Sequence, residues 1–147
     1  MTTLTPNVSE PRPAGVGPAS DRPLVDGPGW TAVCPLDALV PERGAAALVT
    51  GSDGEERQVA LFRLLDDTVC AVQQLDPYAG ANVMSRGIVG TRGGTPTVAS
   101  PVYKQVFELH TGRCLDAAGK EPRAGLAGDL ASYPVVVSGG VVHVGIG

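Results

Sequence analysis

The segment RQVALFRLLDDTVCAVQ occupies residues 57–73. Val59 and Leu61 alternate with their neighbours, which is the period-two pattern of a β-strand. Asp66-Asp67 follows this strand and predicts a hairpin turn. The apolar run from Thr68 to Gln73 then predicts a second strand. The sequence therefore predicts an antiparallel hairpin in this part of the chain.

Further candidate strands are short and are bounded by Gly, Pro or Asp, which favour turns. They are Trp30 to Cys34, Ala45 to Thr50, Thr97 to Ala99, Val106 to Leu109, Arg113 to Leu115, Tyr133 to Ser138 and Val141 to Ile146. Gly139-Gly140 predicts a turn between the last two. No stretch shows ten residues of helical period, and the nearest is a single turn at Pro35 to Leu39. The predicted fold class is all-β, a small sandwich or barrel.

The first 29 residues differ in composition from the rest of the chain. They hold six of the 13 prolines and none of the six aromatic residues. Such a segment buries too little apolar surface to offset the entropy of ordering it. It also lacks the basic start and apolar core of a secretory signal. We therefore expect a disordered Pro-rich tail at residues 1–29 and one β domain at residues 30–147.

Charge and cysteine content exclude several functional classes. The net charge of −4 disfavours nucleic-acid binding, which depends on clustered Lys and Arg. No apolar run reaches the length of a membrane-spanning helix. Cys34, Cys70 and Cys114 are far apart and form no CxxC motif, so we expect reduced thiols that pack as small buried hydrophobes in a cytosolic protein.

Two loop segments carry the most distinctive residues. The first is DPYAGANV, residues 76–83, and the second is SPVYKQVF, residues 100–107. Each opens with a small polar residue followed by proline. Because proline fixes φ and removes a backbone donor, both loops are expected to be stiff at their tips. Thr111-Gly112 predicts a hairpin turn after the second segment.

These segments resemble the two cluster-binding loops of Rieske iron–sulfur domains. In that family the loops read Cys-x-His and Cys-x-x-His, and the two Cys hold one iron while the two His hold the other. Asp76 and Tyr78 stand at the first pair of ligand positions, and Ser100 and Tyr103 stand at the second pair. All four ligand positions are replaced. Other residues of the frame are retained: Pro77, Gly80, Pro101, Phe107, Thr111 and Gly112.

The resemblance narrows to the small subunit of bacterial NAD(P)H-dependent nitrite reductases. It is carried by SRGIVG at 85–90, VASPVYKQ at 98–105 and TGRCLD at 111–116, and it extends from Trp30 to about Val144. It implies a Rieske-like domain without the cluster, acting as a non-catalytic subunit in the cytoplasm. It also implies a large-subunit partner that carries FAD, a [4Fe-4S] cluster and sirohaem. That partner reduces nitrite to ammonium in nitrate and nitrite assimilation, with NADH or NADPH left open.

The chemistry of the replaced positions predicts that this chain holds no metal or cofactor. Ser and Tyr oxygens are poor substitutes for thiolates and imidazoles at all four sites together. His110 and Cys114 flank a turn and are close in sequence, but two groups do not make a metal site. The glycines of residues 87–94 are not followed by a helical pattern, so they predict turns and no phosphate-binding loop.

The residues at the replaced positions have structural roles that can be predicted separately. Tyr78 and Tyr103 are expected to fill the space of a cluster and to hold the two loops together, because buried aromatic side chains contribute large contact areas. Contact of one tyrosine with the large subunit is compatible with that role. Asp76 either caps its own turn or accepts a hydrogen bond from a tyrosine.

The segment between Tyr78 and Arg113 is basic on an acidic chain. It holds four basic residues and one acidic residue, Glu108. We predict that this segment docks on an acidic surface near the active site of the large subunit. A solvated loop surface is the other interpretation. The candidate interface residues are Arg86, Arg92, Lys104 and Gln105.

Two other functions remain open from the sequence. One is a free-standing β-barrel module that binds some other protein or ligand. The other is an electron-transfer protein with a true [2Fe-2S] centre, against which the replaced ligands weigh.

Overall fold

The computed structural model describes residues 29–51 and 53–146, and the predicted tail lies almost entirely outside these residues. The described part forms thirteen strands and two single-turn 3₁₀ helices, which confirms the all-β prediction. In chain order they are β1 (Trp30–Pro35), η3 (Leu36–Ala38), β2 (Gly44–Thr50), β3 (Glu56–Arg63), β4 (Val69–Gln73), β5 (Leu75–Asp76), β6 (Ala81–Asn82), η4 (Met84–Arg86), β7 (Ile88–Arg92), β8 (Thr95–Ala99), β9 (Val106–Glu108), β10 (Cys114–Asp116), β11 (Ser132–Tyr133), β12 (Val135–Ser138) and β13 (Val141–Gly145).

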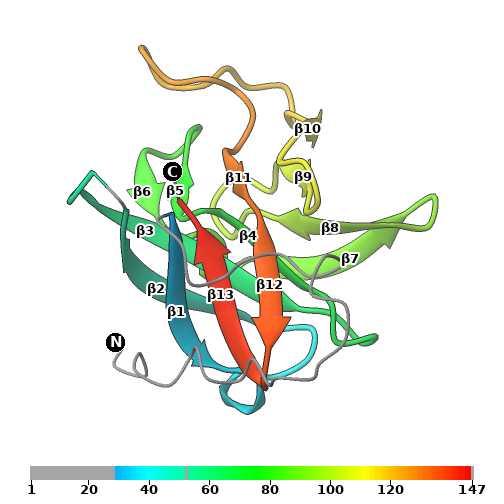
Figure 1. The fold of residues 1–147 in the computed structure, drawn as a ribbon. Helices are drawn as coiled ribbons and strands as arrows, with labels where there is room; N and C mark the ends of the chain where they lie inside the picture. Colours follow the sequence, from blue (N-terminus) through cyan, green and yellow to red (C-terminus); the bar gives the residue numbers. More distant parts are fainter. Residues whose placement is uncertain (1–28, 52, 147) are drawn as a thin grey trace.

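The strands build three larger antiparallel sheets and one small hairpin (Figure 1). Their orders are β1-β13-β12, β11-β4-β3-β2 and β10-β9-β8-β7, and β5 pairs with β6. The predicted hairpin is the β3–β4 pair, in which Phe62 lies opposite Cys70. Its turn is closed by the backbone N–H of Leu64, which donates to the carbonyl of Thr68 at 2.8 Å. The hairpin prediction is therefore confirmed.

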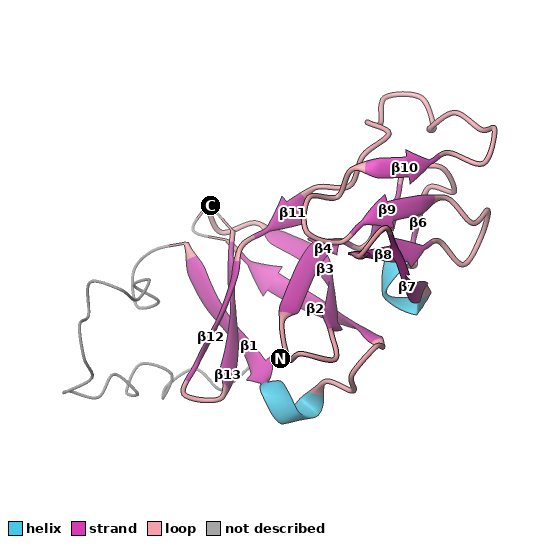
Figure 2. Ribbon diagram, turned by 90° about the vertical axis from the view of Figure 1, so that its right-hand side faces the viewer, coloured by secondary structure: helices cyan, strands magenta, loops and turns pink. Residues whose placement is uncertain are grey.

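The β3–β4 hairpin lies between the other two sheets and buries both of its faces (Figure 2). Side chains of a strand point alternately to opposite faces, so a strand in the middle layer must be apolar on both. Val59 and Leu61 belong to one core, which also contains Val142 and Val144 of β13 and which we call the base-side core. Ala60 and Phe62 belong to the other, the loop-side core, together with Val98 of β8 and Phe107 of β9. The loop-side core consists of Ala60, Phe62, Leu64, Cys70, Val72, Tyr78, Met84, Val98, Phe107, Leu109 and Leu130.

One predicted strand and one predicted turn segment differ from the structure. The strand expected from Tyr133 to Ser138 is interrupted at Pro134, where the chain leaves β4 for β13, because proline has no N–H for a continuous ladder. The glycines of residues 87–94 were expected only in turns, but Ile88–Arg92 forms β7, paired with β8. That strand lies at an edge with its side chains largely exposed, so no apolar alternation marks it.

The three thiols are free, and only one is fully buried. Cys70 is buried, while Cys34 and Cys114 are half-buried against the two cores, so the expectation of three buried thiols is wrong for two of them. Cys34 lies on β1 and Cys114 on β10, which are edge strands of their sheets. Burial raises the pKa of the Cys34 thiol, and it raises that of Cys70 to about 11. Among the residues the structure describes, no helix is long and apolar enough to cross a membrane.

Candidate functional site

The first loop joins β5 to β6 and is organised by Asp76. Its Oδ1 accepts hydrogen bonds from the backbone N–H groups of Tyr78 at 2.8 Å and Ala79 at 3.2 Å. The N–H of Gly80 donates to the Asp76 carbonyl at 2.7 Å, and Gly80 has φ of 72°. This is the turn in which an Asp side chain caps its own backbone. Of the two roles predicted for Asp76, the structure supports the cap.

The second loop joins β8 to β9 and is organised by Ser100. Its backbone N–H donates to the carbonyl of Gln105 at 2.8 Å, and its Oγ accepts from the N–H of Val102 at 3.1 Å. Lys104 has φ of 69°, in the left-handed region that L-residues seldom adopt. The loop therefore closes on itself between Ser100 and Gln105.

A hydrogen bond between two buried side chains joins these loops. Ser100 Oγ donates to Asp76 Oδ2 at 2.5 Å, and the two residues are 1% and 0% exposed. We call this pair the loop latch. A charge-assisted bond between buried groups is among the stronger hydrogen bonds in proteins. By the resemblance, the latch occupies the two positions at which a Rieske domain carries its cysteines.

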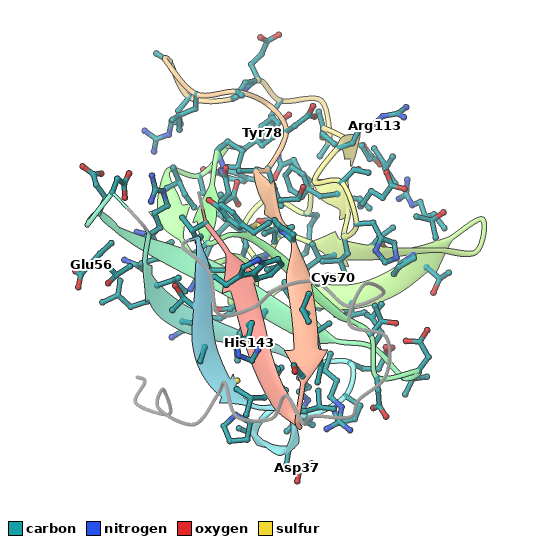
Figure 3. The ribbon with its side chains drawn as sticks, in the orientation of Figure 1. Asp37, Glu56, Cys70, Tyr78, Arg113 and His143 are labelled. Carbon is teal, nitrogen blue, oxygen red and sulfur yellow. The ribbon has the colours of Figure 1, made fainter. Side chains whose placement is uncertain are left out.

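Tyr78 packs the first loop onto the rest of the domain (Figure 3). It is 7% exposed, and its ring lies 6.2 Å from that of Phe107. Its hydroxyl donates to the carbonyl of Gly128 at 3.3 Å and lies 3.6 Å from Cys114 Sγ. Burial, followed by the hydrogen bond to Cys114, raises the pKa of Tyr78 to about 12. Tyr78 is buried, as expected, but the hydrogen bond that joins the two loops is made by Asp76 and Ser100 and not by a tyrosine.

Tyr103 does not share this role. It is 43% exposed, and Lys120 Nζ lies 4.7 Å from its ring centroid. The expectation that Tyr103 fills a buried space is therefore wrong. The turn at Lys104 directs Gln105 inward instead, and Gln105 is 0% exposed and donates through Nε2 to the Ala117 carbonyl at 3.3 Å. Gln105 also precedes buried Phe107 by two residues, and this spacing was the sequence signal for its burial.

The four candidate interface residues do not form one surface. Arg86, Arg92 and Lys104 are exposed, but Gln105 is buried, so its assignment to an interface is wrong. Arg92 Nη2 also lies 3.7 Å from Asp116 Oδ2. The positive charge of Arg92 is thereby partly balanced within the chain.

The pair His110 and Cys114 has separate partners. His110 Nδ1 lies 3.6 Å from Cys70 Sγ, whereas Cys114 Sγ lies beside the Tyr78 hydroxyl. Within residues 29–51 and 53–146, no three His, Cys, Asp or Glu side chains gather as a metal site would require.

The sheet arrangement and the two paired loops define this chain as a Rieske-like domain. Residues 29–145 match the family described as Rieske-like [2Fe-2S] domain. Within it, the chain belongs to the family of NAD(P)H nitrite reductase small subunits. It is 40% identical over 88 residues to the small subunit of NADH nitrite reductase from Escherichia coli K12, which covers 59% of this chain and 77% of that one.

Two further comparisons support the assignment. A solved structure of a candidate NADH-dependent nitrite reductase small subunit from Mycobacterium tuberculosis is 47% identical, with a TM-score of 0.67, and the match covers 81% of this chain and 96% of that one. The NAD(P)H nitrite reductase large subunit of Klebsiella oxytoca is 40% identical over 127 residues, or 86% of this chain. This chain spans only 12% of that relative's length.

The buried thiol of Cys70 and the buried phenol of Tyr78 predict a loss of stability at high pH. The pKa rises from 9.0 to about 11 for Cys70 and from 10.0 to about 12 for Tyr78, chiefly through burial. As the pH rises, the unfolded chain loses the protons of these two groups before the folded chain does. The stabilisation that the two protonated groups give the fold is therefore complete below about pH 9 and is lost as the pH rises through the folded pKa values. We expect the urea midpoint to fall steadily between about pH 9 and 12.

The variant Tyr78→Phe separates the contribution of the Tyr78 hydroxyl from the other causes of unfolding at high pH. The variant is expected to be less stable than the parent at neutral pH, because the contacts with Gly128 and Cys114 are lost. Its urea midpoint should nevertheless fall less steeply above about pH 10, since one titrating group is gone. If the urea midpoints of the parent and the variant fall in parallel as the pH rises, the raised pKa of Tyr78 is contradicted.

Proposed function

We propose that this chain is a cluster-free, non-catalytic small subunit of a cytoplasmic NAD(P)H-dependent nitrite reductase, and that it supports the large subunit. The observation that carries the proposal is the loop latch, in which Asp76 and Ser100 bond to each other at the Rieske cysteine positions. Nitrite reduction to ammonium, and the FAD, [4Fe-4S] and sirohaem groups that it needs, belong to the large subunit. Free thiols at the described cysteines suit a reducing compartment.

The donor set of the two loops does not fit a [2Fe-2S] cluster. Such a cluster binds to thiolates and imidazoles, and the four corresponding groups here are a carboxylate, an aliphatic hydroxyl and two phenols. Each oxygen of Asp76 already accepts a hydrogen bond, and Ser100 Oγ both donates and accepts one. The Tyr103 ring lies at the surface. In place of a cluster, the hydrogen bond between Asp76 and Ser100 joins the two loops, and the buried Tyr78 ring packs near Phe107.

The domain organisation of the relatives supports a role beside the large subunit. In Klebsiella oxytoca the matching segment lies inside a protein named as the large subunit, whereas in Escherichia coli it is a separate small subunit. A domain that is covalently joined to a partner has a high effective concentration at that partner. The same fold as a separate chain must reach the partner through a binding surface, so we propose a specific complex with the large subunit.

Co-expression with a large subunit tests this proposal. A tagged form of this chain is expected to recover the large subunit in a constant ratio through affinity and size-exclusion steps. The chain purified alone under anaerobic conditions should contain no iron and no visible absorption band. Failure to recover the large subunit would favour a free-standing module, and stoichiometric iron with a [2Fe-2S] spectrum would favour an electron-transfer protein.

A further inference from the structure

Unpaired positive charge is concentrated on one part of the domain. Of the basic residues that the structure describes, four make no side-chain hydrogen bond, ion pair or ring contact within residues 29–51 and 53–146. They are Lys104 and Arg113 in the loops of the β7–β10 sheet, Arg86 at the end of η4 just before β7, and Arg43 before β2. Arg113 is shown in Figure 3 at the edge of the β9–β10 hairpin.

The acidic residues of the same region are largely bonded within the chain. Glu108 Oε1 accepts a hydrogen bond from the Thr111 hydroxyl at 2.6 Å, and Asp116 pairs with Arg92. Asp129 Oδ1 accepts one from the N–H of Cys114 at 2.9 Å. Over residues 86–116 the chain holds four basic residues and only two acidic ones, Glu108 and Asp116, so this region is positively charged on a chain whose net charge is −4.

Apolar side chains are exposed beside these cations. On the second loop, Val102 and Tyr103 are each 43% exposed and directly precede Lys104. Ile88 is 69% exposed, follows Arg86 by two residues and lies opposite Ala99, which immediately precedes the second loop. One end of the β7–β8 pair thus carries exposed aliphatic and aromatic groups together with unpaired cations, a combination typical of protein–protein contact residues.

Tyr103 is held in a defined position at this surface. Lys120 Nζ lies over its ring, and Gln105, two residues further on, is anchored to the Ala117 carbonyl in the turn that precedes Lys120. Both contacts link the second loop to the segment after β10. A pre-ordered aromatic side chain loses little conformational entropy on binding, which favours its use as an anchor.

We propose that Ile88, Val102 and Tyr103, flanked by Arg86 and Lys104, form the surface that docks on an acidic, partly apolar patch of the nitrite reductase large subunit. We call this set the docking tip. The inference rests on the proposed function, which supplies the partner, and it names the part of this chain that makes the contact. The Rieske-like loops would then serve as a binding surface in place of a cluster-holding one.

Binding of purified variants to immobilised large subunit tests the docking tip. Tyr103→Ala is expected to weaken binding at least about tenfold, as truncation of an anchor residue does. The double variant Arg86→Glu/Lys104→Glu should weaken binding by a similar factor and reduce its dependence on salt. Arg113→Glu is the matched control, because it reverses an exposed, unpaired cation at the turn after β9, whereas the second loop lies before β9, and it should bind like the parent.

The outcomes separate this inference from the proposed function. If the parent chain does not bind the large subunit at all, both fail. If the parent binds and the tip variants bind equally well, only the docking tip is overturned. A dimer of this chain that Tyr103→Ala abolishes, with binding to the large subunit unchanged, would assign the surface to a second copy and also overturn the inference. The thermal unfolding midpoint of each variant is also measured. A midpoint close to that of the parent shows that the substitution changes binding and not folding.

Discussion

Asp76→Ala is expected to lower the free energy of unfolding by about 3–5 kcal/mol. The substitution removes a fully buried carboxylate that accepts hydrogen bonds from the N–H groups of Tyr78 and Ala79 and from the Ser100 hydroxyl. It leaves these donors without their acceptor in a buried environment, and each lost partner costs about 1–3 kcal/mol. Urea unfolding, followed by circular dichroism and by the fluorescence of Trp30, measures the change.

A double-mutant cycle isolates the contribution of the loop latch. Ser100→Ala alone should cost less than Asp76→Ala, because the backbone bonds of Asp76 survive it. The double variant should be more stable than additivity predicts, with a coupling of about 1–3 kcal/mol between the two positions. Asp37→Ala, at an exposed carboxylate in η3, should change stability by less than about 0.5 kcal/mol. A change below about 1 kcal/mol for Asp76→Ala would contradict the buried latch.

Gly112→Ala is expected to destabilise the domain by about 3 kcal/mol or more, from two causes. Gly112 turns the β9–β10 hairpin with φ of 80°, where a Cβ costs about 1–2 kcal/mol. A Cβ at this position would also overlap the backbone carbonyl of Leu130, which cannot move away like a flexible side chain. The N–H of Leu130 donates to the Gly112 carbonyl at 2.8 Å, so relief of the overlap would disrupt this contact.

Gly119→Ala provides the control for backbone strain. Gly119 has φ of 75°, but a Cβ there would meet no other atom within 4 Å. This variant should therefore cost only about 1–2 kcal/mol from the left-handed conformation. The difference between the two glycine variants measures the close approach of Gly112 to Leu130. Equal losses of stability for the two variants would show that this approach is absent.

The β3–β4 hairpin was predictable because its signals are local. Alternation around Val59 and the turn at Asp66-Asp67 act within a few residues, whatever packs against them. The placement of this hairpin between two sheets was less evident, although the apolar residues on both faces of β3 carry that information. The position of β7 could not be predicted, because an exposed edge strand needs no apolar face and is defined by its pairing with β8.

The candidate site shows the same division between local and distant effects. The cap by Asp76 is a property of its own turn, so its chemistry was readable from the sequence. Its partner Ser100 is 24 positions away, and only tertiary packing brings them together. Tyr78 and Tyr103 stand at corresponding ligand positions but differ in burial, because the left-handed backbone at Lys104 turns Gln105 inward.

Nitrite turnover decides whether this chain supports the large subunit. NAD(P)H oxidation and ammonium production would be measured for the large subunit alone, with the purified iron-free chain, and with the Tyr103→Ala variant at matched concentration. We predict low activity without this chain, recovery on its addition, and weaker recovery with Tyr103→Ala. Equal turnover with and without the chain, or recovery that requires iron bound to the chain, would contradict a cluster-free supporting subunit.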